Sequence, residues 1–199
     1  MMTRRFLWLA SRSPRRAELL SQLGVWFRMA TADIDETPRP DEKPVDYVAR
    51  MAREKAMAGL ASLDDTGGAP VLGADTAVVV DGDILGKPAN AAEAELMLQR
   101  LAGREHEVIS GVCVLDEQRS RSAINRSRVR FSQLDTTRIQ AYLALNDYAD
   151  KAGGYGIQGA AAAFIEHLSG SYSGVMGLPL HETAGLLDDF GIDYALVPR

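Results

Sequence analysis

The chain has 199 residues, of which 46% are hydrophobic and 25% are charged, so it contains enough apolar material for a substantial core. The formal net charge of −5 argues against a general affinity for nucleic-acid backbones or anionic membranes. No stretch approaches the roughly 18 consecutive apolar residues of a membrane span, and the single cysteine, Cys113, excludes an internal disulfide. We therefore expect one cytoplasmic domain over residues 1–199, with no nucleic-acid or membrane partner.

The first predicted elements are a strand over residues 6–10, a short turn and a helix. The strand is an apolar run, and leucines recur at helical spacing beyond the turn until Gly24 ends the helix. Ser13 is the expected N-cap, and Pro14 suits the first helical position because its missing N–H costs nothing there.

Two arginines, Arg15 and Arg16, fall in the first turn of this helix, where the helix dipole disfavours cations. An anionic ligand would explain them, because the free N–H groups of the turn, both guanidinium groups and the hydroxyls of Ser11 and Ser13 converge there. The alternative is that the arginines are solvated or paired with Glu18 and other surface acids. The first explanation predicts an oligophosphate site.

A strand over residues 25–30 should lead into a loop that is interrupted by prolines and ends at Pro44. The loop carries the adjacent acids Asp35 and Glu36. They are candidate ligands for Mg²⁺, because this ion is usually bound through one or two carboxylates and keeps several waters. Adjacent acids in a loop are more often simply solvated, so both interpretations stay open.

A helix is predicted from Pro44 to about Leu60, with apolar residues along one stripe. Lys55 falls on that same stripe. Its ammonium either reaches water past the apolar surface or lies at the floor of a cleft.

The run over residues 71–80 predicts a buried strand, because it is almost wholly apolar and rich in β-branched residues. A two-residue type I′ turn should follow and return an antiparallel strand over residues 83–85. Asp75 is the anomaly, because an unpaired buried charge is costly; it predicts a catalytic or ligand role, with a structural ion pair as the alternative. This turn places Thr76 opposite Lys87, so that the carboxylate of the neighbouring Asp75 and the ammonium of Lys87 come close together.

The second half of the chain predicts the same mixture of elements. We expect helices over residues 91–103 and 179–190, a third helix that is capped by Thr136 or Thr137 and ends near Leu145, and strands over residues 107–115, 125–133 and 160–167. The glycine-rich loop over residues 150–159 is either a surface turn or a close approach to a ligand, with Gln158 available to hydrogen-bond a base edge. The three histidines lack zinc spacing, so we expect structural or exposed roles for them.

Seven short motifs, taken in order, resemble the Maf family of nucleotide pyrophosphatases, and the likeness spans nearly the whole chain. They are Leu9-Ala10-Ser11-x-Ser13-Pro14-Arg15-Arg16, Asp35-Glu36, the helix that carries Lys55, Gly73-Ala74-Asp75-Thr76, Gly86-Lys87-Pro88, Tyr155-Gly156-Ile157-Gln158-Gly159 and Gly177-Leu178-Pro179-Leu180. No single motif is decisive, but their order and separations leave little room for accident.

The resemblance implies a mixed α/β fold, with a strongly twisted sheet, flanking helices and two lobes around a deep cleft, similar to the inosine triphosphate pyrophosphatases. It also implies hydrolysis of a nucleoside triphosphate between the α and β phosphates, with a divalent cation, Mg²⁺ or Mn²⁺. A homodimer is a further implication of the family.

The family has a branch selective for dTTP and UTP and another for 7-methylguanosine triphosphate. This chain has Pro14-Arg15-Arg16 where the methylguanosine branch shows a tryptophan after the proline, and Asp75-Thr76 where that branch shows Asp-Gln. The resemblance therefore favours the dTTP/UTP branch, with the methylguanosine branch as an alternative.

The resemblance assigns a role to each matching side chain. Asp75 is the expected proton acceptor, and Glu36 and Asp75 are the expected metal ligands. The expected phosphate-binding residues are Ser11, Ser13, Arg15, Arg16, Lys55 and Lys87. Selection of the pyrimidine is expected from Arg15, Thr76 and Gln158.

Two rivals belong to other classes of protein. The family was first associated with inhibition of septum formation, so the chain is alternatively a nucleotide-binding regulator with little turnover. Asp75 argues against this, because a pure binder gains nothing from a carboxylate that faces a polyanion. A nucleic-acid-binding module is disfavoured by the acidic balance and by the lack of aromatics between the arginines.

Overall fold

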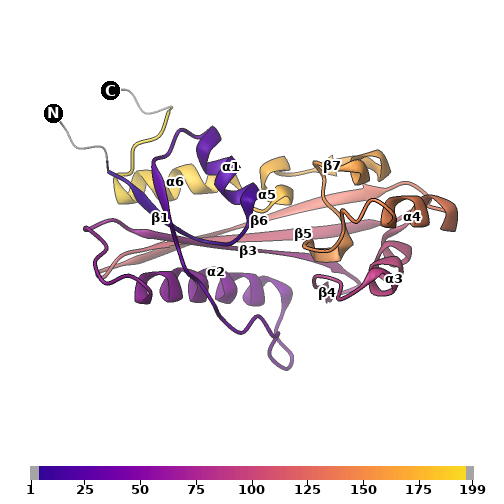
Figure 1. The fold of residues 1–199 in the computed structure, drawn as a ribbon, viewed down its shortest axis with the longest axis horizontal. Coiled ribbons are helices and arrows are strands. Elements are labelled where there is room, and N and C mark those ends of the chain that lie inside the picture. Colours follow the sequence, from indigo (N-terminus) through magenta and orange to yellow (C-terminus); the bar gives the residue numbers. More distant parts are fainter. Residues whose placement is uncertain (1–4, 196–199) are drawn as a thin grey trace.

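The computed structural model describes residues 5–195, and within them seven strands form one mixed sheet (Figure 1). The strands are β1 (Leu7–Ala10), β2 (Phe27–Ala30), β3 (Val71–Val80), β4 (Asp83–Leu85), β5 (Glu105–Leu115), β6 (Ser120–Phe131) and β7 (Ile165–Ser169). The helices are α1 (Pro14–Gln22), α2 (Pro44–Ala61), α3 (Ala91–Leu101), α4 (Thr136–Leu143), α5 (Tyr172–Met176) and α6 (Leu180–Phe190), with 3₁₀ turns η1 (Ala152–Gly154) and η2 (Ala160–Phe164).

The sheet has the order β2-β1-β3-β5-β6-β7, and β4 pairs with β3 beside this path. β1 pairs parallel with β2 and with β3, whereas the other pairings are antiparallel. The expected mixed α/β class is therefore confirmed. None of the helices within residues 5–195 is long and apolar enough to cross a membrane.

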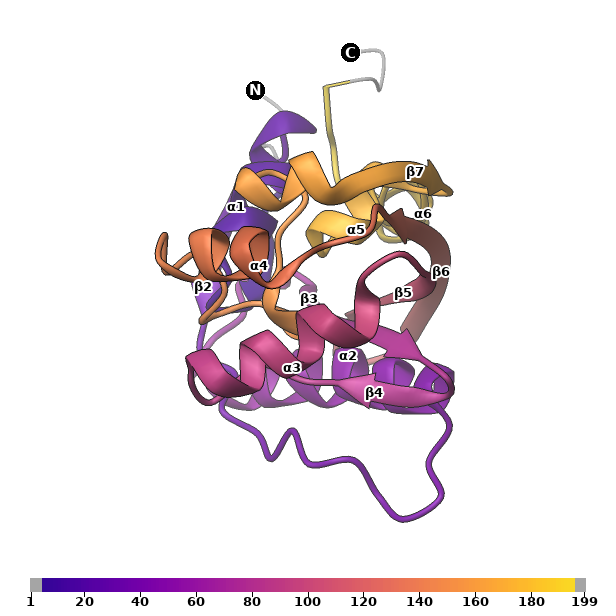
Figure 2. The same ribbon diagram turned by 90° about the vertical axis from the view of Figure 1, so that its right-hand side faces the viewer.

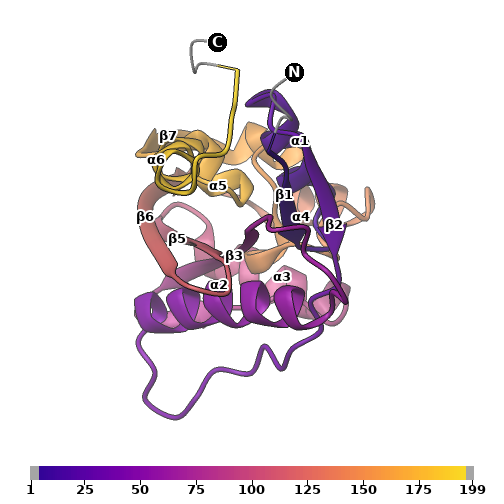
Figure 3. The ribbon, with the colours of Figure 1, turned by 90° about the vertical axis from the view of Figure 1, so that its left-hand side faces the viewer.

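Helices cover both faces of the central strands. α2 lies along one face of β3 and β5, and α1, α5 and α6 lie on the other face (Figures 1 and 3). Because β3 is enclosed on both faces, nine of its ten positions are buried, which explains its almost unbroken apolar sequence.

Two large hydrophobic clusters lie at opposite ends of β3 and define the two lobes. One contains Leu72 of β3 with side chains from β1, α1 and α6. The other contains Val78 and Val80 with side chains from α3, α4 and the start of β5. Figure 2 shows this second lobe end-on, with α3 and β4 on one side and α4 on the other.

The turn between β3 and β4 is the predicted type I′ turn. Asp81 and Gly82 both have positive φ, at 56° and 86°, as this turn requires. The register pairs Val78 with Leu85. If the pairing were continued it would bring Thr76 opposite Lys87 as predicted, although the strand pairing itself ends at Leu85.

Some predicted boundaries were wrong, for local reasons. The strand expected over 160–167 begins with η2, because a run of alanines favours helical over strand backbone, and β7 starts at Ile165. α4 is capped by Asp135, which accepts a hydrogen bond from the Arg138 amide, and not by a threonine. A short helix that the sequence did not predict, α5, follows β7, and Ser171 caps it. Ser13 is the N-cap residue of α1, as predicted, but its side chain makes no capping hydrogen bond.

Candidate active site

A cleft of about 770 Å³ lies between the two lobes. All ten residues predicted for the site line it: Ser11, Ser13, Arg15, Arg16, Glu36, Lys55, Asp75, Thr76, Lys87 and Gln158. The fold therefore gathers side chains that are up to about 150 positions apart in the sequence into one cavity.

A gap in the sheet opens onto this cleft. β1 pairs with β3 only as far as Gly73, and β4 joins the same edge of β3 only from Val78 onward. Among the strands of residues 5–195, none lies beside this edge over residues 74–77. Asp75 and Thr76 lie in this gap, so side chains on both faces of the strand can reach the cleft.

Close packing of α2 against the sheet brings Lys55 to Asp75. A side chain at Gly73 would clash with the backbone of α2, and one at Gly111, the cross-strand neighbour of Asp75, would clash with Val48. Without side chains at these positions the helix approaches closely, and Lys55 faces the side of β3 that carries Asp75.

The floor of the cleft is a buried ion pair. Lys55 and Asp75 are only 7% and 6% exposed, and Lys55 Nζ donates a 2.6 Å hydrogen bond to Asp75 Oδ1. Nζ also lies 2.7 Å from Glu36 Oε1. Lys55 therefore occupies the floor of the cleft and does not extend to open solvent. It lies between Glu36 and Asp75, the two carboxylates that were predicted as metal ligands.

Glu36 is held above this floor from several sides. The Tyr47 hydroxyl donates a 2.9 Å hydrogen bond to the Glu36 carbonyl, and Lys87 Nζ lies 3.5 Å from Glu36 Oε2. Burial alone would raise the pKa of the Glu36 carboxyl, but the hydrogen bond and charge of Lys55, together with Lys87, hold that pKa below its usual range. Glu36 is therefore a carboxylate at neutral pH.

A clamp on α2 fixes the loop that carries Glu36. The Arg50 guanidinium makes two hydrogen bonds of 2.6 Å to the two carboxylate oxygens of Glu42, and a third of 3.2 Å to the Thr37 carbonyl. A bidentate pair of this kind restricts orientation as well as distance. The loop therefore presents Glu36 to the cleft from a constrained backbone.

Arg16 joins three elements on the other side of β3. Its Nε donates a 2.8 Å hydrogen bond to the Gly177 carbonyl at the end of α5, and its Nη1 donates one of 3.3 Å to Ser11 Oγ. Nη2 lies 3.5 Å from Thr76 Oγ1, which is 2.7 Å from Ser110 Oγ. Burial lowers the pKa of the Arg16 guanidinium, while Asp75 partly opposes that shift.

Arg15 reaches across the mouth of the cleft to the opposite lobe. Its Nη1 lies 3.0 Å from Asp150 Oδ2, and Asp150 also pairs with Lys151 at 2.8 Å. Burial would raise the pKa of Asp150, but Lys151 and Arg15 outweigh it and lower that pKa. In the structure Arg15 is thus paired with a surface acid, as the alternative interpretation of pairing with Glu18 and other surface acids has it.

The glycine-rich loop supplies the remaining wall of the cleft. Tyr155 is buried, whereas Gln158 is exposed, and the Gln158 side chain makes no hydrogen bond to any part of residues 5–195. Its amide is therefore free to pair with a ligand.

The two carboxylates at the cleft floor are ligands of the kind that a magnesium-like cation takes. Glu36 and Asp75 supply hard oxygens, and the Lys55 ammonium between them shows that the position accepts a cation. No group of three or more possible protein ligands for a metal ion occurs within the described chain, so a cage built from protein alone is not formed. Asp35 takes no part, since its Oδ1 accepts a hydrogen bond from the Thr37 amide outside the cleft.

Sequence reasoning missed three polar residues that shape the site. Ser110 is buried on β5 and links Thr76 to the Gly174 carbonyl, Tyr47 supports Glu36, and Asp150 holds Arg15. A serine inside the apolar run of β5 was a signal for Ser110. Tyr47 and Asp150 stand in ordinary helix and loop contexts that gave none.

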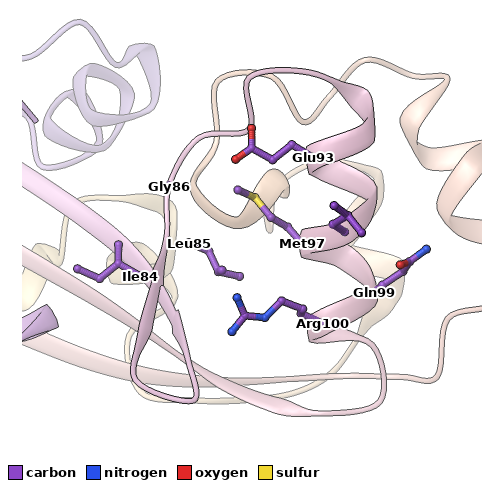
Figure 4. A pocket seen from close by; sticks show the side chains of 8 residues that line it. Ile84, Leu85, Gly86, Glu93, Met97, Gln99 and Arg100 are labelled. Atoms are coloured by element: carbon purple, nitrogen blue, oxygen red, sulfur yellow. The ribbon is translucent and has the colours of Figure 1, made fainter. Parts of the chain in front are cut away.

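A second pocket, of about 640 Å³, lies between β4 and α3 (Figure 4). It shares Ile84, Leu85 and Gly86 with the cleft. Its two labelled charged groups are already engaged, because Glu93 accepts a hydrogen bond from the Ala89 amide and Arg100 pairs with Asp83 at 2.8 Å. The buried acid Asp75 and the basic residues predicted for the site line the cleft instead.

Comparison with known proteins places the chain in a family. Residues 6–190 match the family described as Maf-like protein. The chain is 48% identical over 192 residues to a dTTP/UTP pyrophosphatase of Pasteurella multocida (strain Pm70), a match that covers 94% of this chain and 96% of that one. It is 53% identical over 189 residues to a protein of the same name from Alcanivorax borkumensis, covering 94% and 97%.

Another relative and one solved structure also match. A dTTP/UTP pyrophosphatase of Hahella chejuensis is 50% identical over 189 residues, covering 95% of this chain and 94% of that one. Among solved structures, the Staphylococcus aureus Ham1 protein matches 64% of this chain and 72% of its own, with 11% identity and a TM-score of 0.41, which is too low to carry an argument. The family match, together with relatives that align over nearly the full length, shows that the chain belongs to the Maf family.

Proposed function

We propose that this protein hydrolyses dTTP and UTP between the α and β phosphates and releases the monophosphate and pyrophosphate. The relatives that share about half of its residues carry this activity in their name. The observation that carries the proposal is the buried Asp75 at the floor of a cleft that Arg15, Arg16, Lys55 and Lys87 also line. Four cationic side chains suit a polyanionic substrate, and the buried acid suits a reaction that needs a base.

In this proposal, Asp75 accepts the proton of the water that attacks the α-phosphorus. Lys55 engages Oδ1 of Asp75, and within residues 5–195 no hydrogen bond reaches Oδ2. Oδ2 is therefore the oxygen that takes the proton. A positioned base of this kind contributes roughly 10²–10⁴-fold to the rate.

The cationic side chains hold the triphosphate and stabilise the charge that develops on it. The N–H groups of the first turn of α1 and the hydroxyls of Ser11 and Ser13 complete the cradle for the phosphate oxygens. Arg15 reaches the phosphates by exchanging its exposed partner Asp150 for the substrate. Arg16 keeps its bond to Gly177 and contributes through its remaining N–H groups.

A divalent cation, Mg²⁺ or Mn²⁺, would bind between Glu36 and Asp75 and neutralise charge on the phosphate oxygens. Lys55 bridges these carboxylates, so its ammonium would have to release a carboxylate oxygen to a bound cation, and the triphosphate would offer the ammonium a new partner. The cation and the nucleotide are therefore expected to bind together.

Selection of the pyrimidine is assigned to Arg15, Thr76 and Gln158. The amide of Gln158 can both donate and accept, which matches the N3–H and O4 groups of thymine and uracil. Thr76 is fixed by Ser110 at the edge of the cleft, where a longer side chain would reduce the space.

The test is a panel of natural and modified nucleoside triphosphates, scored separately for pyrophosphate and orthophosphate, with Mg²⁺ or Mn²⁺ present. Pyrophosphate from dTTP and UTP is the expected result. A nucleotide-binding regulator with little turnover would release none in a single-turnover experiment with enzyme in excess. Preferred hydrolysis of 7-methylguanosine triphosphate would place the chain in the other branch.

We also propose a cytoplasmic homodimer. Large apolar side chains are exposed at the edge of the sheet, since Met29 of the edge strand β2 and Trp26 just before it are 51% and 47% exposed, and such side chains suit a subunit contact. The buried thiol of Cys113 is in keeping with a reducing compartment. Sedimentation equilibrium would decide the oligomeric state.

A further inference from the structure

A buried histidine behind the cleft holds a buried tyrosine of the glycine-rich loop that lines it. His106 lies near the start of β5, is 3% exposed and does not line the cleft. Its Nε2 is 2.6 Å from the hydroxyl of Tyr155, which is 5% exposed and does line the cleft. The proposed mechanism gives neither side chain a role.

The surroundings of this pair are aromatic. The His106 ring meets Phe131 edge-on at 5.0 Å, and Phe131 meets Tyr155 at 4.8 Å. Nδ1 of His106 is buried without a hydrogen-bond partner in the part of the chain that the structure describes. Burial also lowers the pKa of His106 to about 4, so the ring is neutral at physiological pH.

Stability alone does not account for such a pair. One hydrogen bond offsets the loss of water around two polar side chains, and one nitrogen is left unsatisfied. Two apolar side chains of similar shape would serve this cluster about as well or better. The hydrogen bond adds orientation. It fixes the position of the Tyr155 hydroxyl, and the Tyr155 side chain in turn restrains the backbone that carries it.

Tyr155 stands between an anchored segment and the cleft. On its N-terminal side, the Gly153 amide donates a 3.0 Å hydrogen bond to the Gly86 carbonyl, which precedes Lys87. On its C-terminal side, a turn closed by the bond from the Gly159 amide to the Gly156 carbonyl carries Gln158. The side chain of Gln158 has no bond of its own within residues 5–195, so its position depends on this backbone.

We propose that His106 is a positioning residue: through its hydrogen bond to Tyr155 it fixes the turn over residues 156–159 and so sets the place of Gln158 against the nucleobase. The consequence for base selection rests on the proposed function. The consequence for the order of the turn does not, and it can be measured on the ligand-free protein.

The experiment compares Tyr155→Phe with the double variant His106→Phe/Tyr155→Phe. The single variant removes only the hydroxyl, and the double variant replaces the polar pair by an apolar one. The matched control is Ile139→Val, which removes a methylene group from the same hydrophobic cluster and leaves its polar pair intact. The readouts are hydrogen exchange of the 156–159 amides, the melting temperature, and the ratio of kcat/KM for dTTP to that for dCTP.

We expect Tyr155→Phe to speed exchange of these amides about three- to tenfold and to lower the dTTP/dCTP ratio by a similar factor, as the loss of one oriented hydrogen bond implies. The double variant should have the melting temperature of the wild type, but its amide exchange should stay fast and its dTTP/dCTP ratio should stay low. Ile139→Val should lower the melting temperature and leave both other readouts unchanged.

Wild-type exchange in both Phe variants would overturn the positioning role. Faster exchange with an unchanged dTTP/dCTP ratio would overturn its effect on base selection. Recovery of selectivity in the double variant would show that packing, and not the hydrogen bond, sets the loop. A wild-type protein that releases no pyrophosphate from dTTP would defeat the proposed function, and the exchange data would still decide the role of His106.

Discussion

Lys55 and Asp75 form a buried ion pair whose Nζ and Oδ1 atoms lie 2.6 Å apart, one on α2 and the other on β3. Their contact exists because α2 packs against a stretch of sheet where Gly73 and Gly111 present no side chain. The same ammonium reaches Glu36, so one lysine organises both carboxylates of the cleft.

Replacement of Asp75 by asparagine should abolish most of the activity and keep the fold. Asparagine has nearly the same shape but is a poor proton acceptor, so kcat should fall by roughly 10²–10⁴-fold. Pyrophosphate release from dTTP is the measurement. Asp83→Asn is the control, because Asp83 pairs with Arg100 outside the cleft. Near wild-type turnover in Asp75→Asn would refute the assignment of the base.

Replacement of Lys55 by methionine should destabilise the ligand-free protein by about 3–5 kcal/mol, because Asp75 is then a buried charge without its partner. Mn²⁺ should raise the melting temperature of the variant more than that of the wild type, since the two carboxylates are then free for a cation. Thermal unfolding with and without Mn²⁺ measures both effects. In the control Lys87→Met, an exposed pair is lost and the expected cost is within about 1 kcal/mol. Equal Mn²⁺ shifts in Lys55→Met and wild type would contradict the metal site.

Replacement of Arg16 by lysine should lower kcat/KM by about ten- to a hundredfold, mainly through KM. Lysine keeps the charge, but one ammonium cannot bond Gly177 and Ser11 in the fork that the guanidinium uses. Steady-state kinetics with dTTP would show it. Arg12→Lys, which changes an exposed arginine of the same loop, should behave as wild type. An unchanged KM in Arg16→Lys would detach this loop from the phosphates.

The Arg50 clamp should make stability depend on pH through Glu42. The hydrogen bonds from Arg50 lower the pKa of Glu42 from 4.5 to about 2 in the folded protein. Its contribution to stability is therefore complete above about pH 4.5 and is lost as the pH falls toward 2. Urea unfolding of wild type and Glu42→Gln should show a difference at pH 6 that shrinks by pH 3. A difference that does not vary with pH would refute the clamp.

Local chemistry made much of the fold predictable. The apolar run of β3, the type I′ turn and the strand–turn–helix around Pro14 depend on neighbouring residues, and the structure shows each of them. One boundary was predicted wrongly although its cause is also local: the alanine-rich residues 160–164 adopt a 3₁₀ turn, and strand pairing with β6 begins only at Ile165.

The candidate site, too, was predictable from the sequence only in part. Residue type marked Asp75 as an anomaly, because a charge inside an apolar strand needs a partner. The identity of that partner was not readable: the predicted turn geometry suggested Lys87, whereas Lys55 holds Asp75 and Lys87 holds Glu36. Likewise, helical spacing could place Lys55 on an apolar stripe, but only the approach of α2 showed where its ammonium goes.

By itself, the sequence determined most of the helices and strands, which acid is out of place and which family the motifs resemble, because these follow from residue type and short-range spacing. Tertiary structure alone decided which charges meet, since ion pairs such as Arg15 with Asp150 join residues 135 positions apart. It also decided that β3 has an open edge between β1 and β4. The extent of that edge depends on where β1 and β4 stop pairing with β3. The residues of β3 that line the edge do not themselves indicate this.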